Sequence, residues 1–449
     1  MATVEHAPIQ PVLGIGFGPA NLSTAIAAQD NGLLEHCHFV ERAPEFEWQS
    51  EQMLTGADIQ NNPFRDLVMP RDPGHEYTFV RYLHGRGVLT DYLHYNAKFA
   101  LRNEYAGYLQ WVASHFADRV TYGQEVRAVE VVQRHGGECF EVRTAERMWH
   151  ARHLIVGTGR TPNVPGCFAI DSPRIFHAGR YLSTMRRLAR ERAELRTVAV
   201  VGSSQSAIEI ILDLLARPDV GRVVSIQRGI GFRLKDTSPF SRRVFLPEFI
   251  DYFHPLPLET KKRLREQLRA VNYGACDQDV IDQLTTVQRD YEHRGSDRFT
   301  LMSFSQVRTV VGQGDGALLL TLADVNNGDT ASLGVDAVVL ATGYRDFGTG
   351  PDDELSHPLL RSVRHRIACE ADGTPVVHRD YSLEFASAEG SLSVYLNGVC
   401  EASHGMGDAG ALAVLSARAH DIAESMRARL RADAFEQPVP ARNGLLSVS

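Results

Sequence analysis

Two stretches of the chain share one pattern, in which an apolar run, a turn of small residues and a segment with helical spacing follow one another. The first apolar run ends at Ile15, and an alanine-rich segment starts at Ala20. The second run, Thr197–Val201, has no polar alternation, and the apolar residues after it fall on one helical face: Ile208, Ile211, Leu212 and Leu215. Such unbroken runs are typical of parallel strands covered on both faces. The pattern therefore predicts two strand–turn–helix units.

The rest of the pattern places these units in separate domains. Two further apolar runs end in Thr-Gly, at Thr158-Gly159 and Thr342-Gly343, which predicts chain crossings between two domains. Helical spacing with irregular connections extends from Asp236 to about Asp297. We therefore predict an α/β fold with two Rossmann-like dinucleotide-binding domains and a smaller, mostly helical substrate-binding region. The expected limits are 1–165 with 335–449 for the first domain, 166–235 with 300–334 for the second, and 236–299 for the helical region.

The first turn has the residue types of a dinucleotide-binding site. Glycines at every second position allow a tight turn and a close approach to a pyrophosphate at the N-terminus of the next helix. The expected cofactor-binding residues of this turn are Gly14, Gly16, Gly18, Pro19 and Asn21. Glu41 ends a second apolar run, 27 residues after Gly14, where a carboxylate binds a ribose hydroxyl. The alternative for Glu41 is a surface glutamate beside Arg42.

The second turn has the related pattern G-x-S-x-x-A. Its expected cofactor-binding residues are Gly202, Ser204, Gln205 and Ser206. Arg228 ends the next apolar run, 26 residues after Gly202. A guanidinium at this position suits the 2′-phosphate of NADPH better than the free ribose hydroxyl of NADH. The alternative for Arg228 is a solvated arginine at a strand end.

Composition and charge narrow the classes of protein that fit. The 449 residues are 43% hydrophobic and 23% charged, which is ordinary for a soluble protein. The net charge of −8 provides no electrostatic footprint for nucleic acid or an acidic membrane surface. No apolar run approaches the ~18 residues that span a bilayer, and the first residues lack the features of a signal peptide. We therefore expect a cytoplasmic protein that binds neither nucleic acid nor membranes.

The six cysteines are far apart, and none forms a C-x-x-C pair. Their spacing argues against a redox-active disulfide, a zinc site and a secreted disulfide framework, so no metal is expected. Two dinucleotide-binding units without a disulfide indicate a flavin that accepts hydride from a nicotinamide. The electrons then pass to an external acceptor, and molecular oxygen is the leading candidate.

Several short motifs occur in order along nearly the whole chain. They are Gly14–Leu22, Trp48, Ile59-Gln60, Arg65–Leu67, Thr78-Phe79, Tyr82-Leu83, Gly202–Glu209, Asp236–Phe240, Asn272-Tyr273, Ala341–Tyr344 and His404-Gly405. Together they resemble the flavin-dependent N-hydroxylating monooxygenases. Those enzymes act on L-ornithine, L-lysine or related diamines on the way to hydroxamate siderophores and other N–O compounds.

The resemblance implies FAD in the first domain and NADPH in the second. It implies hydroxylation of the terminal primary amine of an amino acid such as L-ornithine or L-lysine, through a C4a-hydroperoxyflavin, for siderophore or other natural-product biosynthesis. An ammonium ion has no lone pair with which to attack oxygen, so the site must favour the neutral amine. The expected partners are therefore a small primary amine and molecular oxygen, and the expected assembly is a homo-oligomer, either a dimer or a tetramer.

The resemblance also implies roles for individual residues. Gln60 matches a glutamine that lies against the flavin, and Asn272 matches an asparagine that contacts both nicotinamide and substrate. These two are the expected catalytic residues, and Asn272 also belongs to the substrate site. Arg65 takes the place of a lysine that binds the substrate carboxylate, which a guanidinium can bind in bidentate fashion. The other motif positions expected to bind cofactor are Trp48, Thr342, Gly343 and His404.

The chain departs from the family pattern at positions expected near the substrate. Arg242 and Arg243 replace an Asn-Glu pair whose asparagine contacts the amino-acid end of the substrate, so we assign Arg242 to the substrate site. Met406–Gly410 replaces a Leu-Ser-Asp-Thr-like stretch. The added arginines indicate either an extra carboxylate on the substrate or surface charge. The alternatives are an N-hydroxylase of a non-standard amine, a flavin monooxygenase that acts at sulfur or carbon, and a flavoprotein without turnover.

Overall fold

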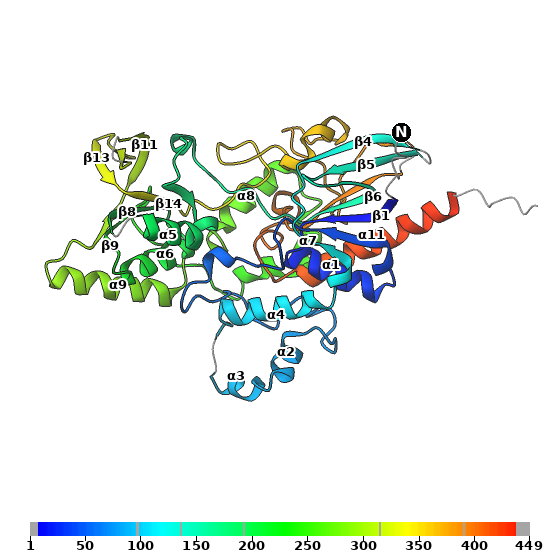
Figure 1. Ribbon diagram of the computed structural model, residues 1–449, viewed down its shortest axis with the longest axis horizontal. Helices are drawn as coiled ribbons and strands as arrows, with labels where there is room; N and C mark the ends of the chain where they lie inside the picture. The colour runs from blue at the N-terminus through cyan, green and yellow to red at the C-terminus, as the bar shows by residue number, and fades with distance from the viewer. Residues whose placement is uncertain are drawn as a thin grey trace, which may run out of the picture.

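The computed structural model describes residues 8–95, 98–134, 137–191, 194–313, 316–388 and 391–436. Two sheets lie toward opposite ends of an elongated molecule, and helical segments run between and beneath them (Figure 1). No helix within these ranges is long and apolar enough to cross a membrane.

The first sheet has the strand order β3-β2-β1-β6-β5-β4, and β15 pairs with the second half of β6. Neighbours among β3, β2, β1, β6 and β15 pair in parallel, whereas β4 and β5 are antiparallel additions. The last four residues of β1 are buried, as expected for a strand covered on both faces. The bounds are β1 (Ile9–Ile15), β2 (Cys37–Val40), β3 (Val120–Thr121), β4 (Ala128–Arg134), β5 (Gly137–Arg143), β6 (Met148–Val156) and β15 (Ser393–Leu396).

The second sheet has the order β10-β9-β8-β14-β7, and all of its pairs are parallel. The expected limit of the second domain at residue 334 is too early. Strand β14 lies between β8 and β7 with all four of its residues buried, so it is an interior strand of this sheet. The bounds are β7 (Ile175–His177), β8 (Leu195–Val201), β9 (Val220–Ile226), β10 (Phe299–Met302) and β14 (Ala337–Leu340).

A small antiparallel sheet covers one face of the second sheet. It consists of β11 (Ser305–Gly312), β12 (Leu318–Asp324) and β13 (Thr330–Val335). Val307 and Leu320 of this sheet belong to the same buried apolar cluster as Val224 and Val338 of the larger one. The small sheet therefore supplies a second apolar layer rather than a separate domain core.

Helices cover both large sheets and fill the space between them. Alongside the first sheet, α1 (Pro19–Asp30) packs against α11 (Leu415–Glu436), and the second sheet carries α5 (Tyr181–Glu191) and α6 (Gln205–Ala216). The segment expected to be helical contains η6 (Ser241–Phe245), α7 (Pro247–Phe253), α8 (Leu258–Leu268), η7 (Arg269–Val271) and α9 (Gln278–His293). The remaining helices are α2 (Phe79–Gly85), α3 (Leu89–Tyr95), α4 (Arg102–Ser114), α10 (Glu401–His404), η1 (Leu34–His36), η2 (Ser50–Gln52), η3 (Ala117–Arg119), η4 (Gly166–Phe168), η5 (Ala178–Arg180) and η8 (Pro358–Arg366).

The chain passes twice between the two large sheets, after β6 and after β14. The two crossings lie against each other, because the Asn163 N–H donates to the Gly343 carbonyl (2.9 Å) and the Arg345 N–H donates to the Thr161 carbonyl (2.8 Å). The crossings predicted from the two Thr-Gly endings are confirmed. Their pairing fixes the two sheets side by side, with the ends of β1 and β8 on either side of the junction.

Candidate active site between two dinucleotide turns

Glycine shapes the turn that follows β1. Gly16 has a φ of +85°, and a Cβ atom there would lie 2.7 Å from the carbonyl oxygen of Gly157. A Cβ atom on Gly14 would lie 2.1 Å from the ring of Phe39. Neither distance is possible for a larger residue without moving the backbone or the core. The turn therefore has the close packing that a dinucleotide-binding loop requires.

The open side of this turn is suited to a pyrophosphate and a ribose. Gly18 faces open space and is the N-cap of α1, and no side chain caps the free N–H groups that follow Pro19. The Glu41 carboxylate is held at the end of β2 because it accepts hydrogen bonds from the N–H groups of Phe17 (2.7 Å) and Ala43 (2.9 Å). Each carboxylate oxygen keeps a lone pair for a ribose hydroxyl.

A buried polar network holds the first turn from behind. Asn21 donates to the Gly16 carbonyl (2.7 Å) and accepts from the Asn397 side chain (2.8 Å). Arg418 of α11 donates to the Asn397 side chain (2.8 Å) and to Oδ1 of Asp408 (2.7 Å). Asn21, Asn397, Asp408 and Arg418 are all at most 2% exposed. Both ends of the Asn21 side-chain amide are engaged within the protein, so this side chain positions the turn. Contact of Asn21 with the cofactor stays a prediction, which its backbone N–H at the start of α1 can meet.

The turn that follows β8 also requires glycine and leads into an uncapped helix, but fewer side chains hold it in place. Gly202 has a φ of +140°, and a Cβ atom there would lie 2.2 Å from the carbonyl oxygen of Ala341. Ser204 is the N-cap of α6 and forms no side-chain cap, and its hydroxyl lies 3.2 Å from that of Ser206. Residues 202–206 are all half-exposed. Free N–H groups at the start of α6 therefore face an accessible space, as phosphate binding requires.

Arg228 is exposed just beyond the end of β9, where it can reach a 2′-phosphate. Thr342 and Gly343 lie just after β14. Thr342 donates to the Asn163 carbonyl (2.5 Å), and the Gly343 carbonyl accepts from Nε2 of His177 (2.8 Å). These groups hold the chain crossing, and cofactor binding by Thr342 and Gly343 stays a prediction.

A buried ion pair ties α6 to the first half of the chain. Nη2 of Arg102 in α4 lies 3.1 Å from the Glu209 carboxylate of α6, and the same guanidinium donates to the Asp58 carbonyl. Gln205 donates to Glu209 (3.2 Å) and accepts from the Asp277 N–H (2.9 Å). Burial raises the pKa of Glu209, and the charge of Arg102 opposes that rise. The pair brings the second turn next to the segment that carries Gln60.

Gln60 lies where its segment meets the second turn, a place that we call the junction, and its backbone conformation is constrained. Its φ is +51°, which is uncommon for a residue other than glycine. The Gln60 N–H donates to Asp58 (2.8 Å), and its side-chain oxygen accepts from Nζ of Lys235 (3.1 Å). Burial raises the pKa of Asp58 to about 6 and lowers the pKa of Lys235. The side-chain NH₂ of Gln60 is left as the donor toward a ligand.

The segment that contains Lys235 also brings Asn272 to the junction. The Lys235 N–H donates to the Cys276 carbonyl (2.8 Å), and the Asp236 N–H donates to the Ala270 carbonyl (3.0 Å). Asn272 lies between these two contacts and is half-exposed. The two residues expected to be catalytic therefore lie on segments that are joined through Lys235.

Arg65 and Arg242, the two arginines expected to bind substrate, are close enough to act on each other. Burial, and then the like charge of Arg242, lower the pKa of Arg65. Nη1 of Arg65 is buried and has no hydrogen-bond partner among the described residues. An unpartnered guanidinium N–H in a partly buried position is a binding group for an anion.

Trp48 and His404 differ in what they offer a ligand. Trp48 is half-buried, its ring lies 5.7 Å from that of Tyr105 in a tilted arrangement, and it lines a groove of about 260 Å³. His404 is 1% exposed, stacks at 4.0 Å on Tyr381, and lies 3.2 Å from the carbonyl oxygen of Arg379. Burial lowers the pKa of His404 well below its usual value, so the ring is neutral. The His404 ring is enclosed by the protein, and its contact with a cofactor stays a prediction.

A buried ionic cluster anchors the residue that follows Asn272. Tyr273 donates to the Glu401 carboxylate (2.5 Å), and the guanidinium of Arg160 lies 5.2 Å from the Tyr273 ring. Arg160 and Arg265 both bond to Asp346 at 3.0 Å. Burial raises the pKa of Glu401 to about 8. The cluster joins α8, α10 and the second chain crossing, and thereby fixes the loop that carries Asn272.

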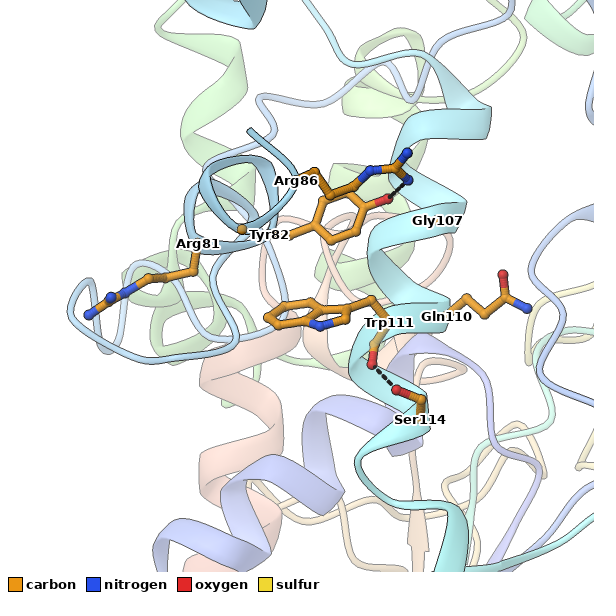
Figure 2. Close-up of a pocket in the computed structure, with 8 residues that line it drawn as sticks. Arg81, Tyr82, Arg86, Gly107, Gln110, Trp111 and Ser114 are labelled. Atoms are coloured by element: carbon orange, nitrogen blue, oxygen red, sulfur yellow. Dashed lines mark hydrogen bonds between the residues drawn. The ribbon is translucent and has the colours of Figure 1, made fainter. Parts of the chain in front are cut away.

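A separate groove of about 540 Å³ lies between α2 and α4 (Figure 2). The rings of Tyr82 and Trp111 lie beside each other at 5.6 Å, and Arg86 donates to the Tyr82 hydroxyl (3.1 Å). Its lining residues are Arg81, Tyr82, Gly85, Arg86, Gly107, Gln110, Trp111 and Ser114, none of which is an expected site residue. The groove therefore has no assigned part in the reaction.

The sequence pattern did not reveal three supporting contacts. They are the Gln60–Lys235 hydrogen bond, the Arg102–Glu209 ion pair and the Asn397–Arg418–Asp408 network. Lys235 offers one signal, since it directly precedes the Asp236–Phe240 motif. Glu209 also ends the Gly202–Glu209 motif, and Asp408 lies in the Met406–Gly410 stretch. Their partners Arg102, Asn397 and Arg418 carry no sequence signal and meet them only in the folded chain.

Known proteins are similar over most of the chain. The family model of L-lysine 6-monooxygenase/L-ornithine 5-monooxygenase matches residues 9–346. An L-ornithine N(5)-monooxygenase from Burkholderia cepacia is 36% identical over 416 residues, which cover 90% of this chain and 91% of that protein. An enzyme of the same name from Pseudomonas aeruginosa is 30% identical over 438 residues, with 95% of each chain covered.

Solved structures share the fold over the same length. The ornithine hydroxylase of Pseudomonas aeruginosa superposes with a TM-score of 0.83 at 29% identity and covers 94% of this chain and 100% of its own. The ornithine N-hydroxylase of Kutzneria sp. 744, solved with reduced FAD, NADP⁺ and L-ornithine, has a TM-score of 0.84 at 29% identity and the same coverage. The resemblance seen in the motifs is confirmed. The chain belongs to the L-lysine 6-monooxygenase/L-ornithine 5-monooxygenase family.

Proposed function

We propose that this protein is an FAD- and NADPH-dependent monooxygenase that hydroxylates the primary amine of a small amino acid of the ornithine or lysine type, for siderophore or other natural-product biosynthesis. The central observation is the junction at which the second dinucleotide turn, Gln60 and the Asn272 loop meet. The amine, O₂, NADPH and a proton give the hydroxylamine, NADP⁺ and water. NADPH and the amine nitrogen each supply two electrons, which together reduce O₂.

The first turn fits FAD. The N-terminus of α1 beyond Gly18 would hold the pyrophosphate, the packing of Gly14 and Gly16 keeps the loop close to it, and Glu41 would bind the ribose. Trp48 is a further contact candidate beside this domain. When bound, the flavin takes hydride from NADPH and activates oxygen.

The second turn fits NADPH. The start of α6, with Gly202, Ser204 and Ser206, would hold the pyrophosphate, and Arg228 would bind the 2′-phosphate. Gln205 supports this turn through Asp277 and Glu209. We assign the NADPH domain to residues 166–235 with 299–340 and the helical substrate region to 236–298. The FAD domain then consists of the chain before residue 166 and the chain after residue 340.

The residues at the junction orient the amine and keep it reactive. The free NH₂ of Gln60 and the half-exposed amide of Asn272 are positioned to orient bound groups, and Arg65 would bind the substrate carboxylate. Positive charge on Lys235, Arg65 and Arg242 lowers the pKa of a nearby amine, because it disfavours a further cation. The surroundings therefore favour the neutral amine that the reaction requires.

The test is hydroxylamine formation by the purified flavoprotein with NADPH, oxygen and a panel of amines. We expect an amine-dependent N-hydroxylated product, and NADPH oxidation that releases only peroxide with every amine would overturn the proposal. Arg65→Ala should raise the KM for carboxylate-bearing amines. The matched control is Arg81→Ala, an exposed arginine on α2, and an unchanged KM for Arg65→Ala would remove Arg65 from the site.

We also expect a cytoplasmic homo-oligomer. The six cysteines lie in described ranges and are free thiols, which suits a reducing compartment. Leu93 and Tyr95 of α3 are 60% and 72% exposed, and their apolar surface is suited to contact between subunits. Light scattering after size-exclusion chromatography tests this expectation. A monomer at all concentrations would contradict it.

A further inference from the structure

Cationic side chains gather beside Gln60. Lys235 donates to the Gln60 side chain at 3.1 Å. Arg242 of η6 acts electrostatically on both Lys235 and Arg65. Lys98 is a fourth cation within electrostatic reach of Lys235. Positive charge is therefore concentrated beside Gln60, next to the second dinucleotide turn.

The backbone around Arg65 is held firmly. The neighbouring Asp66 is fully buried and accepts hydrogen bonds from the N–H groups of Val68, Met69 and Phe79 at 2.7–2.9 Å. The Asn61 side chain donates to the Arg65 carbonyl (3.2 Å). Arg65 is thus presented from a fixed loop, which reduces the entropy lost when it binds a ligand.

The backbones that carry Lys235 and Arg242 are fixed in the same way. The Lys235 N–H bonds to the Cys276 carbonyl (2.8 Å), and the Arg242 N–H bonds to the Ser238 carbonyl (2.9 Å). Val244 and Phe245, which follow Arg242 in η6, are buried. Arg243 differs, because it is exposed to solvent.

The two arginines of this group form no ion pair within the described part of the chain. Asp58 and Asp277 act on Lys235, whereas the like charge of Arg242 acts on Arg65. Among the described residues, neither Arg65 nor Arg242 has a carboxylate oxygen within 4.0 Å, and Nη1 of Arg65 has no hydrogen-bond partner. Two guanidinium groups are therefore available to carboxylates of a ligand. Gathering like charges in a half-buried site is unfavourable until an anion binds.

The reactive forms of candidate amines differ in net charge. Ornithine or lysine with a neutral terminal amine keeps one ammonium and one carboxylate, so its net charge is zero. An amino acid with two carboxylates and a neutral amine has a net charge of −2 and offers one carboxylate to each unpaired guanidinium. We propose that the preferred substrate of this enzyme is an aminodicarboxylate, bound through Arg65, Arg242 and Lys235. This inference rests on the proposed N-hydroxylation and moves the reacting amine from the end of a side chain to the α-carbon of a diacid.

The test uses the flavin-loaded enzyme and amino acids matched in shape but not in charge. L-aspartate is compared with L-asparagine, L-glutamate with L-glutamine, and both pairs with L-ornithine and L-lysine. We measure hydroxylamine formation, and binding by calorimetry without NADPH. We expect kcat/KM and affinity about 100-fold higher for one of the diacids than for its amide, because the amide leaves a cation unpaired. Comparison of the aspartate pair with the glutamate pair shows which length of diacid the enzyme prefers.

Variants separate substrate recognition from general charge. Arg242→Gln should raise the KM and Kd for the diacid by about 30-fold, with little change in kcat, since a charge-assisted contact is lost. Arg65→Lys keeps the charge but loses the bidentate fork, so a smaller rise is expected. Arg243→Gln makes the same charge change at an exposed position and should have little effect. Bound flavin and melting temperature report whether each variant folds.

These measurements separate the preference for a diacid from the proposed N-hydroxylation. Preference for ornithine or lysine over both diacids, with hydroxylamine formed, would overturn the substrate inference and leave N-hydroxylation standing. Equal effects of Arg242→Gln and Arg243→Gln would show that the arginines act as surface charge, which also overturns it. No hydroxylamine from any amine would overturn the proposed function itself.

Discussion

The turn after β1 and the turn after β8 have related sequences but different surroundings. Asn21, at the start of α1, and three residues from a later part of the chain, Asn397, Asp408 and Arg418, brace the first turn, and each is at most 2% exposed. The second turn takes its support from Gln205 and the Arg102–Glu209 pair. Gly16, Gly18 and residues 202–206 are all half-exposed. Both turns therefore have an open side, and the first has the more deeply buried support.

This difference corresponds to two modes of cofactor use. A cofactor that stays bound through many turnovers benefits from a rigid site, because little order is lost on binding. A cosubstrate that must enter and leave does not need such firm support. The stronger bracing of the first turn therefore suits FAD, and the lighter support of the second turn suits NADPH.

Arg418→Ala should have the largest effect. It leaves Asp408 buried without its partner, and breaking a buried pair costs about 3–5 kcal/mol of unfolding free energy. The first turn loses its support at the same time, so the purified variant should contain much less FAD. Urea denaturation and flavin absorbance measure the two effects. Arg427→Ala, on the same helix with a half-exposed i,i+3 partner, is the control, and full FAD retention in Arg418→Ala would refute the bracing role.

Gly202→Ala should affect the second turn alone. The new Cβ atom meets the Ala341 carbonyl in a backbone conformation unsuited to alanine, and strain of about 1–3 kcal/mol corresponds to a KM for NADPH raised about 10- to 100-fold. Flavin content should stay at the wild-type level. Gly229→Ala, where the added atom meets nothing within 4 Å, is the control. Loss of flavin in Gly202→Ala would contradict the assignment of FAD and NADPH to separate turns.

Burial of Glu401 predicts a pH dependence of stability. Burial raises the pKa of Glu401 from its usual value of 4.5 to about 8, so between these values the folded protein holds a proton that the unfolded chain releases. Stability should therefore fall as pH rises from about 5 to 8. Glu401→Gln should remove this fall. Parallel stability–pH curves for the two proteins would contradict the assignment.

Arg228→Ala should have the smallest effect. Loss of one charge-assisted contact to the 2′-phosphate corresponds to a KM for NADPH raised about tenfold. The KM for NADH should not change, because NADH lacks this phosphate. Steady-state kinetics with both cofactors give the comparison within one protein. Equal changes for NADPH and NADH would show that Arg228 does not read the phosphate.

Local pattern predicted the two strand–turn–helix units and the Thr-Gly crossings, because these depend on residues adjacent in the chain. Contacts between distant residues were not predictable in the same way. Asn21 pairs with Asn397, 376 residues away, and β14 joins the second sheet because β7 and β8 flank it. His404 shows the same limit, since its place in the sequence did not reveal that tertiary packing encloses its ring.

The most direct test of the proposed N-hydroxylation is the origin of the oxygen atom in the product. The purified enzyme is supplied with NADPH, its preferred amine and ¹⁸O₂, and the product is analysed by mass spectrometry. We expect one ¹⁸O atom on the nitrogen of the former primary amine. Product labelled at carbon or sulfur, or NADPH oxidation that yields only labelled peroxide with an unchanged amine, would contradict it.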